Sequence, residues 1–191
     1  MLFLGFGSGL PYILLISTST AWLRDVNVDL SYIGFFTWIT FTYTFKFAWA
    51  PLVDRFSIPF LAQYGHRKSW IAFMQILIFL SLLFISNIDP IENFILFCAV
   101  GATIAFAGSI QDIAIDAFRI EYAHISDQGN LAASYQLGYR LAIIAATSIA
   151  LIFADINGWS MTFKLMAGLM CLGLLGVIFS KEEKNKELGK L

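Results

Sequence analysis

Charged residues are scarce in this chain: Asp, Glu, Lys and Arg make up only 13% of its 191 residues, against roughly 25% in a soluble domain. The hydrophobic share is 59%, and the mean hydropathy is +0.76. This composition excludes a soluble domain and indicates an integral membrane protein whose main partner is the lipid bilayer. The net charge of -1 and the lack of a basic patch argue against a nucleic-acid partner.

Cysteine is also rare. The two cysteines, Cys98 and Cys171, stand alone within apolar runs, and neither has a second ligand at metal-binding spacing. We therefore expect no metal, no disulfide and no resident cofactor, and interpret both cysteines as small core residues.

Long apolar runs dominate what remains, and a membrane span needs about 20 such residues. The predicted fold class is an all-α membrane protein, with a six-span bundle over residues 1–180 and a charged tail over 181–191. The first run lacks the basic start and short apolar core of a cleaved signal, so we interpret it as a span. The predicted spans are Leu2–Leu23, Ser31–Val53, Trp70–Ser86, Asn93–Phe118, Leu131–Ala154 and Trp159–Ser180.

Basic residues gather on one side of these spans, and Lys and Arg favour the cytoplasmic side of a membrane. The other side carries Arg24 together with acidic residues such as Asp29 and Asp89. The asymmetry predicts a multi-pass protein with both termini in the cytoplasm. The basic residues of the predicted cytoplasmic side are Arg55, Arg67, Lys68, Arg119, Lys181, Lys184, Lys186 and Lys190.

Four charged residues lie well inside the predicted spans: Lys46, Asp112, Asp116 and Arg140. Lys164 is near the outer end of the sixth span and is interpreted as an interface residue. Each of the four costs roughly 2.5–3.5 kcal/mol at the middle of a helix on insertion scales, so such residues usually mark function. At ~1.5 Å per residue, Lys46, Asp112 and Arg140 lie about 9–14 Å from the cytoplasmic ends of their spans. One interpretation is a substrate or proton pathway, and the other is an ion-pair network that locks the bundle.

Polar and small residues accompany these charges. Tyr43 shares a helical face with Lys46, and Gln111 precedes Asp112. The first span contains a run of glycines and a proline, which favours either a flexible helix that lines a cavity or simple tight packing. The residues of this run are Gly5, Gly7, Gly9 and Pro11.

The connection between the second and third predicted spans contains Asp54-Arg55 and, after an insertion, Gly65-His-Arg67-Lys68. It resembles the Gly-x-x-x-Asp-Arg-x-Gly-Arg-Arg loop of the major facilitator superfamily, with Ala50 in place of the first glycine. The resemblance implies a cytoplasmic latch between two transporter halves, formed by Asp54, Arg55, Arg67 and Lys68. Ordinary anchoring by positive charge on the cytoplasmic side is the alternative for these residues.

Further strings resemble a narrower family, the muropeptide permeases of the AmpG type. They follow one another along nearly the whole chain and include all four intramembrane charges. These strings are Gly5-Phe-Gly-Ser-Gly-Leu-Pro11, Ile33-Gly-Phe-Phe36, Phe45-Lys-Phe-Ala-Trp-Ala-Pro-Leu-Val-Asp-Arg55, Gln111-Asp-Ile-Ala-Ile-Asp-Ala117 and Leu137-Gly-Tyr-Arg140.

This resemblance implies a transporter, not an enzyme, that imports anhydro-muropeptides across the bacterial inner membrane for peptidoglycan recycling, driven by the proton gradient. Asp112, with Asp116, is expected to take up the proton. Lys46 and Arg140 are expected either to hold substrate carboxylates or to release the two acids in turn, and Gln111 to contact sugar or peptide amides.

The length departs from the family, whose members have two six-helix bundles, whereas this chain corresponds to the amino-terminal one. Substrate sites of such transporters lie between the two halves. A separate carboxy-terminal half is therefore an expected partner, beside the small glycopeptide substrate. A non-transporting fragment or scaffold, from a split or decayed gene, is the alternative.

A remote alternative is a membrane prenyltransferase. Asp112 and Asp116, one helical turn apart, faintly resemble an aspartate-rich motif that binds magnesium through oxygen ligands. That chemistry needs a second acidic cluster on the same side of the membrane, and the sequence shows none.

Overall fold

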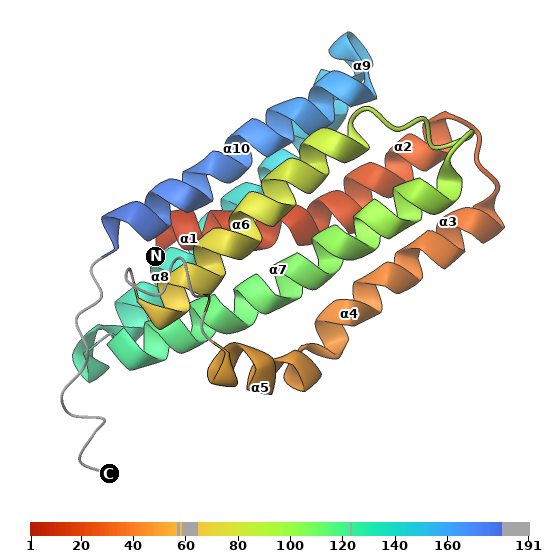
Figure 1. Ribbon diagram of the computed structural model, residues 1–191. Coiled ribbons are helices and arrows are strands. Elements are labelled where there is room, and N and C mark those ends of the chain that lie inside the picture. The colour runs from red at the N-terminus through yellow and green to blue at the C-terminus, as the bar shows by residue number, and fades with distance from the viewer. Residues whose placement is uncertain (57, 59–64, 123, 181–191) are drawn as a thin grey trace.

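The computed structural model describes residues 1–56, 58, 65–122 and 124–180, and all regular structure in these residues is helical. The tail predicted for residues 181–191 lies outside the described residues. The elements pack as a bundle of long helices that run side by side (Figure 1). In chain order they are α1 (Leu2–Ile13), η1 (Leu14–Thr18), α2 (Ser19–Asp25), α3 (Leu30–Thr37), η2 (Trp38–Thr40), α4 (Phe41–Thr44), α5 (Lys46–Arg55), α6 (His66–Ile85), α7 (Phe94–Tyr122), η4 (Ile125–Asp127), α8 (Gln128–Ile144), η5 (Ala145–Ile149), α9 (Ala150–Asn157) and α10 (Trp159–Phe179).

Five helical stretches are long and apolar enough to cross a membrane. Helices suit this role because every backbone polar group in hydrocarbon must find its hydrogen-bond partner within the protein. The stretches correspond to the first, third, fourth, fifth and sixth predicted spans. They are Leu2–Asp25, His66–Ile85, Phe94–Glu121, Ile125–Asn157 and Trp159–Phe179.

The second predicted span, 31–53, is a series of short helical pieces and not one continuous helix. The backbone leaves helical geometry at Phe45, where φ is -86° and ψ is 13°, and α5 begins at Lys46. Figure 1 shows α5 turned away from the line of α3 and α4. The break places Lys46 at the amino-terminal end of α5.

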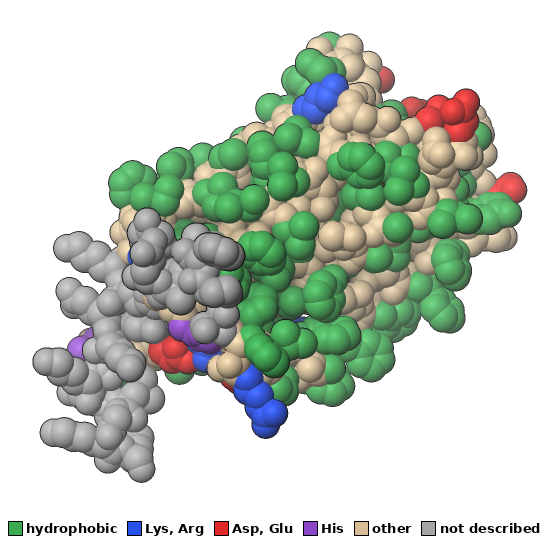
Figure 2. Space-filling model, in the orientation of Figure 1, with side chains coloured by type: hydrophobic (Ala, Val, Ile, Leu, Met, Phe, Trp, Pro, Cys, Tyr) green, Lys and Arg blue, Asp and Glu red, His purple; other side chains and the backbone are tan. Residues whose placement is uncertain are grey.

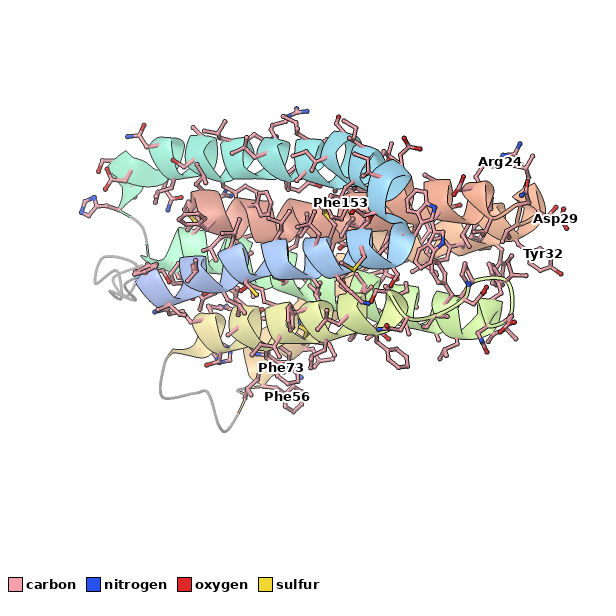
Figure 3. All side chains as sticks on the ribbon, turned by 90° about the horizontal axis from the view of Figure 1, so that it is seen from above. Arg24, Asp29, Tyr32, Phe56, Phe73 and Phe153 are labelled. Atoms are coloured by element: carbon pink, nitrogen blue, oxygen red, sulfur yellow. The ribbon has the colours of Figure 1, made fainter. Side chains whose placement is uncertain are left out.

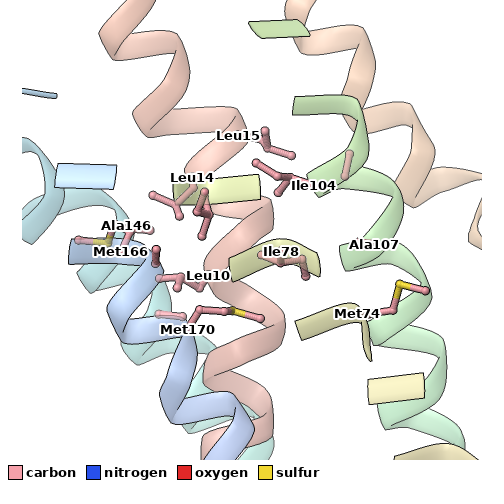
Figure 4. Close-up of a cluster of buried hydrophobic side chains, with 14 of the residues drawn as sticks. Leu10, Leu14, Leu15, Met74, Ile78, Ile104, Ala107, Ala146, Met166 and Met170 are labelled. Atoms are coloured by element: carbon pink, nitrogen blue, oxygen red, sulfur yellow. The ribbon is translucent and has the colours of Figure 1, made fainter. Parts of the chain in front are cut away.

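The first span is the centre of the bundle, because α1 packs against α7, α8 and α10. Its residues from Leu4 to Pro11 are buried. Figure 4 shows part of the apolar core around this span. Buried side chains labelled there are Leu10, Leu14, Leu15, Met74, Ile78, Ile104, Ala107, Ala146, Met166 and Met170.

Two wide, π-helical turns interrupt the first and fifth spans and contact each other: η1 and η5. The Thr18 hydroxyl donates a hydrogen bond to the Ala146 carbonyl across this contact. Pro11, which has no backbone N–H, precedes η1 by three residues. The two helices are therefore irregular at matching positions and joined there by a polar contact.

The bundle has an apolar flank and charged ends. Figure 2 shows hydrophobic side chains spread along the visible flank and acidic side chains at both ends, with one group of them at the upper right. Figure 3 places Arg24, Asp29 and Tyr32 at the end that carries this group. The distribution suits a membrane-crossing bundle, while the cytoplasmic position of the termini stays a prediction.

Candidate functional site

A cavity of about 420 Å³ opens beside α7, at the side of the bundle where α4 and α5 meet α1 and α8. This volume is within the range of ligand pockets. Two ionisable groups, Lys46 and Asp112, line it together with aromatic rings and hydroxyls. The full lining is Tyr12, Thr40, Phe41, Tyr43, Thr44, Lys46, Asp112 and Tyr139.

Asp112 is held by a chain of hydroxyls from two other helices. The Ser8 hydroxyl of α1 donates a hydrogen bond to Asp112 Oδ1. Ser8 Oγ also lies 2.8 Å from the Tyr135 hydroxyl of α8, and either of these atoms can be the donor. Because each hydroxyl both donates and accepts, the chain can adjust to an ionised or a protonated Asp112.

Asp116, one turn further along α7, lies between two cations. Its Oδ2 is 4.0 Å from Lys46 Nζ, and its Oδ1 is 3.5 Å from Arg119 Nη2. The Arg119 guanidinium also lies over the Tyr135 ring, 5.8 Å from the ring centroid. Asp112, by contrast, makes no ion pair with the described residues. The two carboxylates therefore have different surroundings, one dominated by hydroxyls and the other by cations.

Tyr43 joins the cavity wall to α7. Its ring packs edge-on against Tyr12, with 4.8 Å between centroids. Its hydroxyl fills the space that a side chain at position 108 would need, so only a glycine there permits the contact. Tyr43 and Lys46, which were predicted to share a helical face, both line the cavity.

Two other predicted site residues lie away from the cavity. Gln111 is fully buried, and its amide lies near Gly7, as does that of Gln75 from α6. Arg140 is exposed on α8 and does not line the cavity. The structure thus joins Lys46, Asp112, Asp116 and Tyr43 in one site, with Gln111 in the helix packing and Arg140 outside it.

The predicted latch residues separate into different contacts. Arg67, whose side chain is only 10% exposed, lies 2.7 Å from Asp54 and 2.6 Å from Glu121. These ion pairs tie α5, α6 and the end of α7 together. Lys68 Nζ donates to the Ser180 carbonyl at 2.6 Å, at the end of α10. Arg55 is exposed and forms no ion pair within the described part of the chain.

Replacing Arg67 with leucine is expected to lower the free energy of unfolding by about 1–3 kcal/mol, because two carboxylates lose their shared partner. Arg55→Leu at the same end of the bundle is the matched control and should change stability little. Thermal unfolding of the purified chain in detergent measures both. Equal unfolding temperatures for the two variants would contradict the stabilising role of Arg67.

The glycine run of the first span packs closely. A side chain at Gly5 would meet the Tyr135 carbonyl, one at Gly7 would come within 3.1 Å of Gln75, and one at Gly9 within 3.1 Å of the Tyr139 ring. This is the geometry of the tight-packing alternative. That the run also makes the helix flexible stays a prediction.

Several residues of the site were not predicted from the sequence. Tyr135 and Tyr139 lie one turn apart on the fifth predicted span, a spacing that could have indicated them. Ser8 lies inside the glycine run, and nothing in its sequence context distinguishes it. The residues that were missed are Ser8, Tyr12, Thr40, Thr44, Arg119, Glu121, Tyr135 and Tyr139.

Comparisons with known proteins show relatives of this chain among bacterial permeases. The anhydromuropeptide permease of Escherichia coli (strain K12) is 36% identical over 183 residues, which cover 95% of this chain and 37% of that protein. A proposed transporter of Rickettsia conorii, AmpG 4, is 33% identical over 183 residues and is covered to 44%. Another of Rickettsia typhi, AmpG 3, is 30% identical over 188 residues and is covered to 45%. The chain thus spans less than half the length of these relatives.

The family model described as Major Facilitator Superfamily matches residues 1–190. This match accounts for the all-helical bundle and places the chain among transporters rather than enzymes, so the prenyltransferase alternative is set aside. The chain belongs to the Major Facilitator Superfamily, as a multi-pass membrane protein related to bacterial muropeptide permeases.

Proposed function

We propose that this chain forms the amino-terminal half of a proton-coupled transporter that imports anhydro-muropeptides across the bacterial inner membrane. The observation that carries the proposal is the pair of carboxylates on α7. Among the described residues, Asp112 lines the cavity and has a hydroxyl as its hydrogen-bond partner, whereas Asp116 is paired with Lys46 and Arg119. The chemical class of the substrate is taken from the relatives, and both termini are placed in the cytoplasm.

The charges explain how a proton and an anion could move together. With Asp112 ionised, two carboxylates balance Lys46 and Arg119. With Asp112 protonated, the same four groups carry a net positive charge, which attracts a substrate carboxylate to Lys46. Loss of the proton on the cytoplasmic side restores the balance, so Lys46 returns to the carboxylates and the substrate is released.

The cavity supplies one wall of such a site. Substrate sites of secondary transporters lie near the middle of the membrane, between two repeated bundles. The cavity is lined from one bundle only, and the remaining wall is proposed to come from a carboxy-terminal half. That half is either a continuation of this chain or a separate protein.

A second candidate, left open by the sequence, is a non-transporting fragment or scaffold. The test uses a bacterial strain without its own muropeptide permease. The chain is produced together with the part of the Escherichia coli permease beyond the matched region, and uptake of labelled anhydro-muropeptide is measured. Restored, proton-gradient-dependent uptake is expected. Absent uptake with both parts present in the membrane would favour the scaffold.

A further inference from the structure

Arg140 is the intramembrane charge that the site leaves unexplained. Lys46 and Asp116 pair with each other, and Ser8 bonds to Asp112. Arg140 is exposed on α8, does not line the cavity, and forms no ion pair with any residue that the structure describes. No side chain in the described part of the bundle compensates its charge.

The depth of Arg140 is too great for its side chain to reach water. The helical stretch that contains it runs over Ile125–Asn157, but its first turns are polar, with Ser126, Asp127 and Asn130, so its apolar part begins near Leu131. At ~1.5 Å per residue, about 14 Å of helix separates Arg140 from Leu131 and about 21 Å separates it from Ala154. A long side chain can reach the interface only from near a helix end. An unpaired guanidinium at this depth would therefore lie in hydrocarbon, which costs roughly 2.5–3.5 kcal/mol or more.

The surroundings on α8 show which way the charge faces. Tyr139, the preceding residue, lines the cavity, whereas Leu137, Leu141 and Ile144 are exposed apolar residues. Successive residues are about 100° apart on a helix. Arg140 and the exposed Gln136 therefore form a polar stripe between the cavity side and the apolar side. A polar stripe beside the open side of a half-built site is a surface that another part of the protein must cover.

We propose that Arg140 docks against a transmembrane helix of the carboxy-terminal half and pairs there with an Asp or Glu side chain. This inference rests on the proposed function in one respect, because it requires a carboxy-terminal half. More than half the length of the relatives lies outside the matched region, so the covering helix has a source. The planar guanidinium matches a carboxylate in a two-pronged pair, and such pairs set the orientation of partners. A substrate carboxylate is the other possible occupant.

The test measures association directly. The tagged chain and the remainder of the Escherichia coli permease are produced together and transferred to lipid nanodiscs. The amount of remainder that co-purifies with the tagged chain is measured over a range of concentrations. Arg140→Leu is expected to weaken association at least tenfold, as for truncation of a buried charge pair. Arg24→Leu, at the exposed end of the bundle, is the matched control and should have no effect. Changing one intramembrane acid of the remainder to its amide should reproduce the loss, without a further loss when combined with Arg140→Leu.

Three results would overturn the inference, and a fourth would contradict only the proposed function. Unchanged association with lost uptake would assign Arg140 to the substrate. Unchanged association together with unchanged uptake would mean that Arg140 faces lipid. Failure of the wild-type pair to associate would mean that no carboxy-terminal half covers Arg140. Normal association of the wild-type pair without uptake would contradict the proposed function alone.

Discussion

Replacing Asp112 with asparagine is expected to abolish accumulation of substrate against its gradient while leaving the bundle folded. Asparagine has the same shape and can still accept the hydrogen bond from Ser8, but it cannot bind a proton. The site then stays permanently in its positively charged state. Substrate exchange between the two sides should continue, whereas uptake driven by a pH gradient should fall at least tenfold, because no proton is carried.

The measurement compares uptake into proteoliposomes, with and without an imposed pH gradient, for the chain assembled with a carboxy-terminal half. Asp155→Asn, an exposed carboxylate near the turn before α10, is the matched control and should keep its gradient dependence. Gradient-dependent uptake by the Asp112 variant would show that another group carries the proton. Asp116→Asn provides a further comparison, since it leaves both Lys46 and Arg119 without their carboxylate.

Valine at Gly5 or at Gly138 is expected to prevent formation of a stable bundle. A Cβ atom at Gly5 would overlap the Tyr135 carbonyl, and one at Gly138 would overlap the Leu2 carbonyl. Both obstacles are backbone atoms, which cannot move aside as a side chain can. The two helices would have to separate, and α1 would lose its closest neighbour at the centre of the bundle. We expect a loss of more than about 3 kcal/mol in the free energy of unfolding, the upper end of overpacking effects.

The check is thermal unfolding of the purified chain in detergent, followed by near-ultraviolet circular dichroism. Gly168→Ala on α10 is the control, because a side chain there has open space within 4 Å. That variant should be as stable as the wild type or slightly more so, since alanine favours a helix over glycine. A Gly138→Val variant that unfolds at the wild-type temperature would contradict the close α1–α8 contact.

The long spans illustrate what can be predicted from hydropathy. Runs such as 70–86 and 159–180 are mostly apolar, and hydrocarbon permits only helices there; the structure has helices over His66–Ile85 and Trp159–Phe179. The structure of the second predicted span was harder to predict, because hydropathy gives no sign of a local break in the backbone. The break at Phe45 matters to the site, since Lys46 follows it directly.

The site itself was predicted only in part. Lys46, Asp112 and Asp116 stand out because charges are costly within apolar runs. The prediction that Lys46, Asp112 and Arg140 share a depth did not show which would meet, and Arg140 lies outside the cavity. Ser8 could not be recognised, because a serine between glycines in a span is unremarkable in composition.

By itself, the sequence determined that this protein crosses a membrane as helices, and which residues carry charge inside it. Both follow from local composition, because each charge and each unpaired backbone group in hydrocarbon has its own free-energy cost. Only the tertiary structure decided which groups meet. Ser8 and Asp112 are 104 positions apart, and Arg67 and Glu121 are 54 apart. Such contacts depend on how closely whole helices approach, which the glycines between α1 and α8 control.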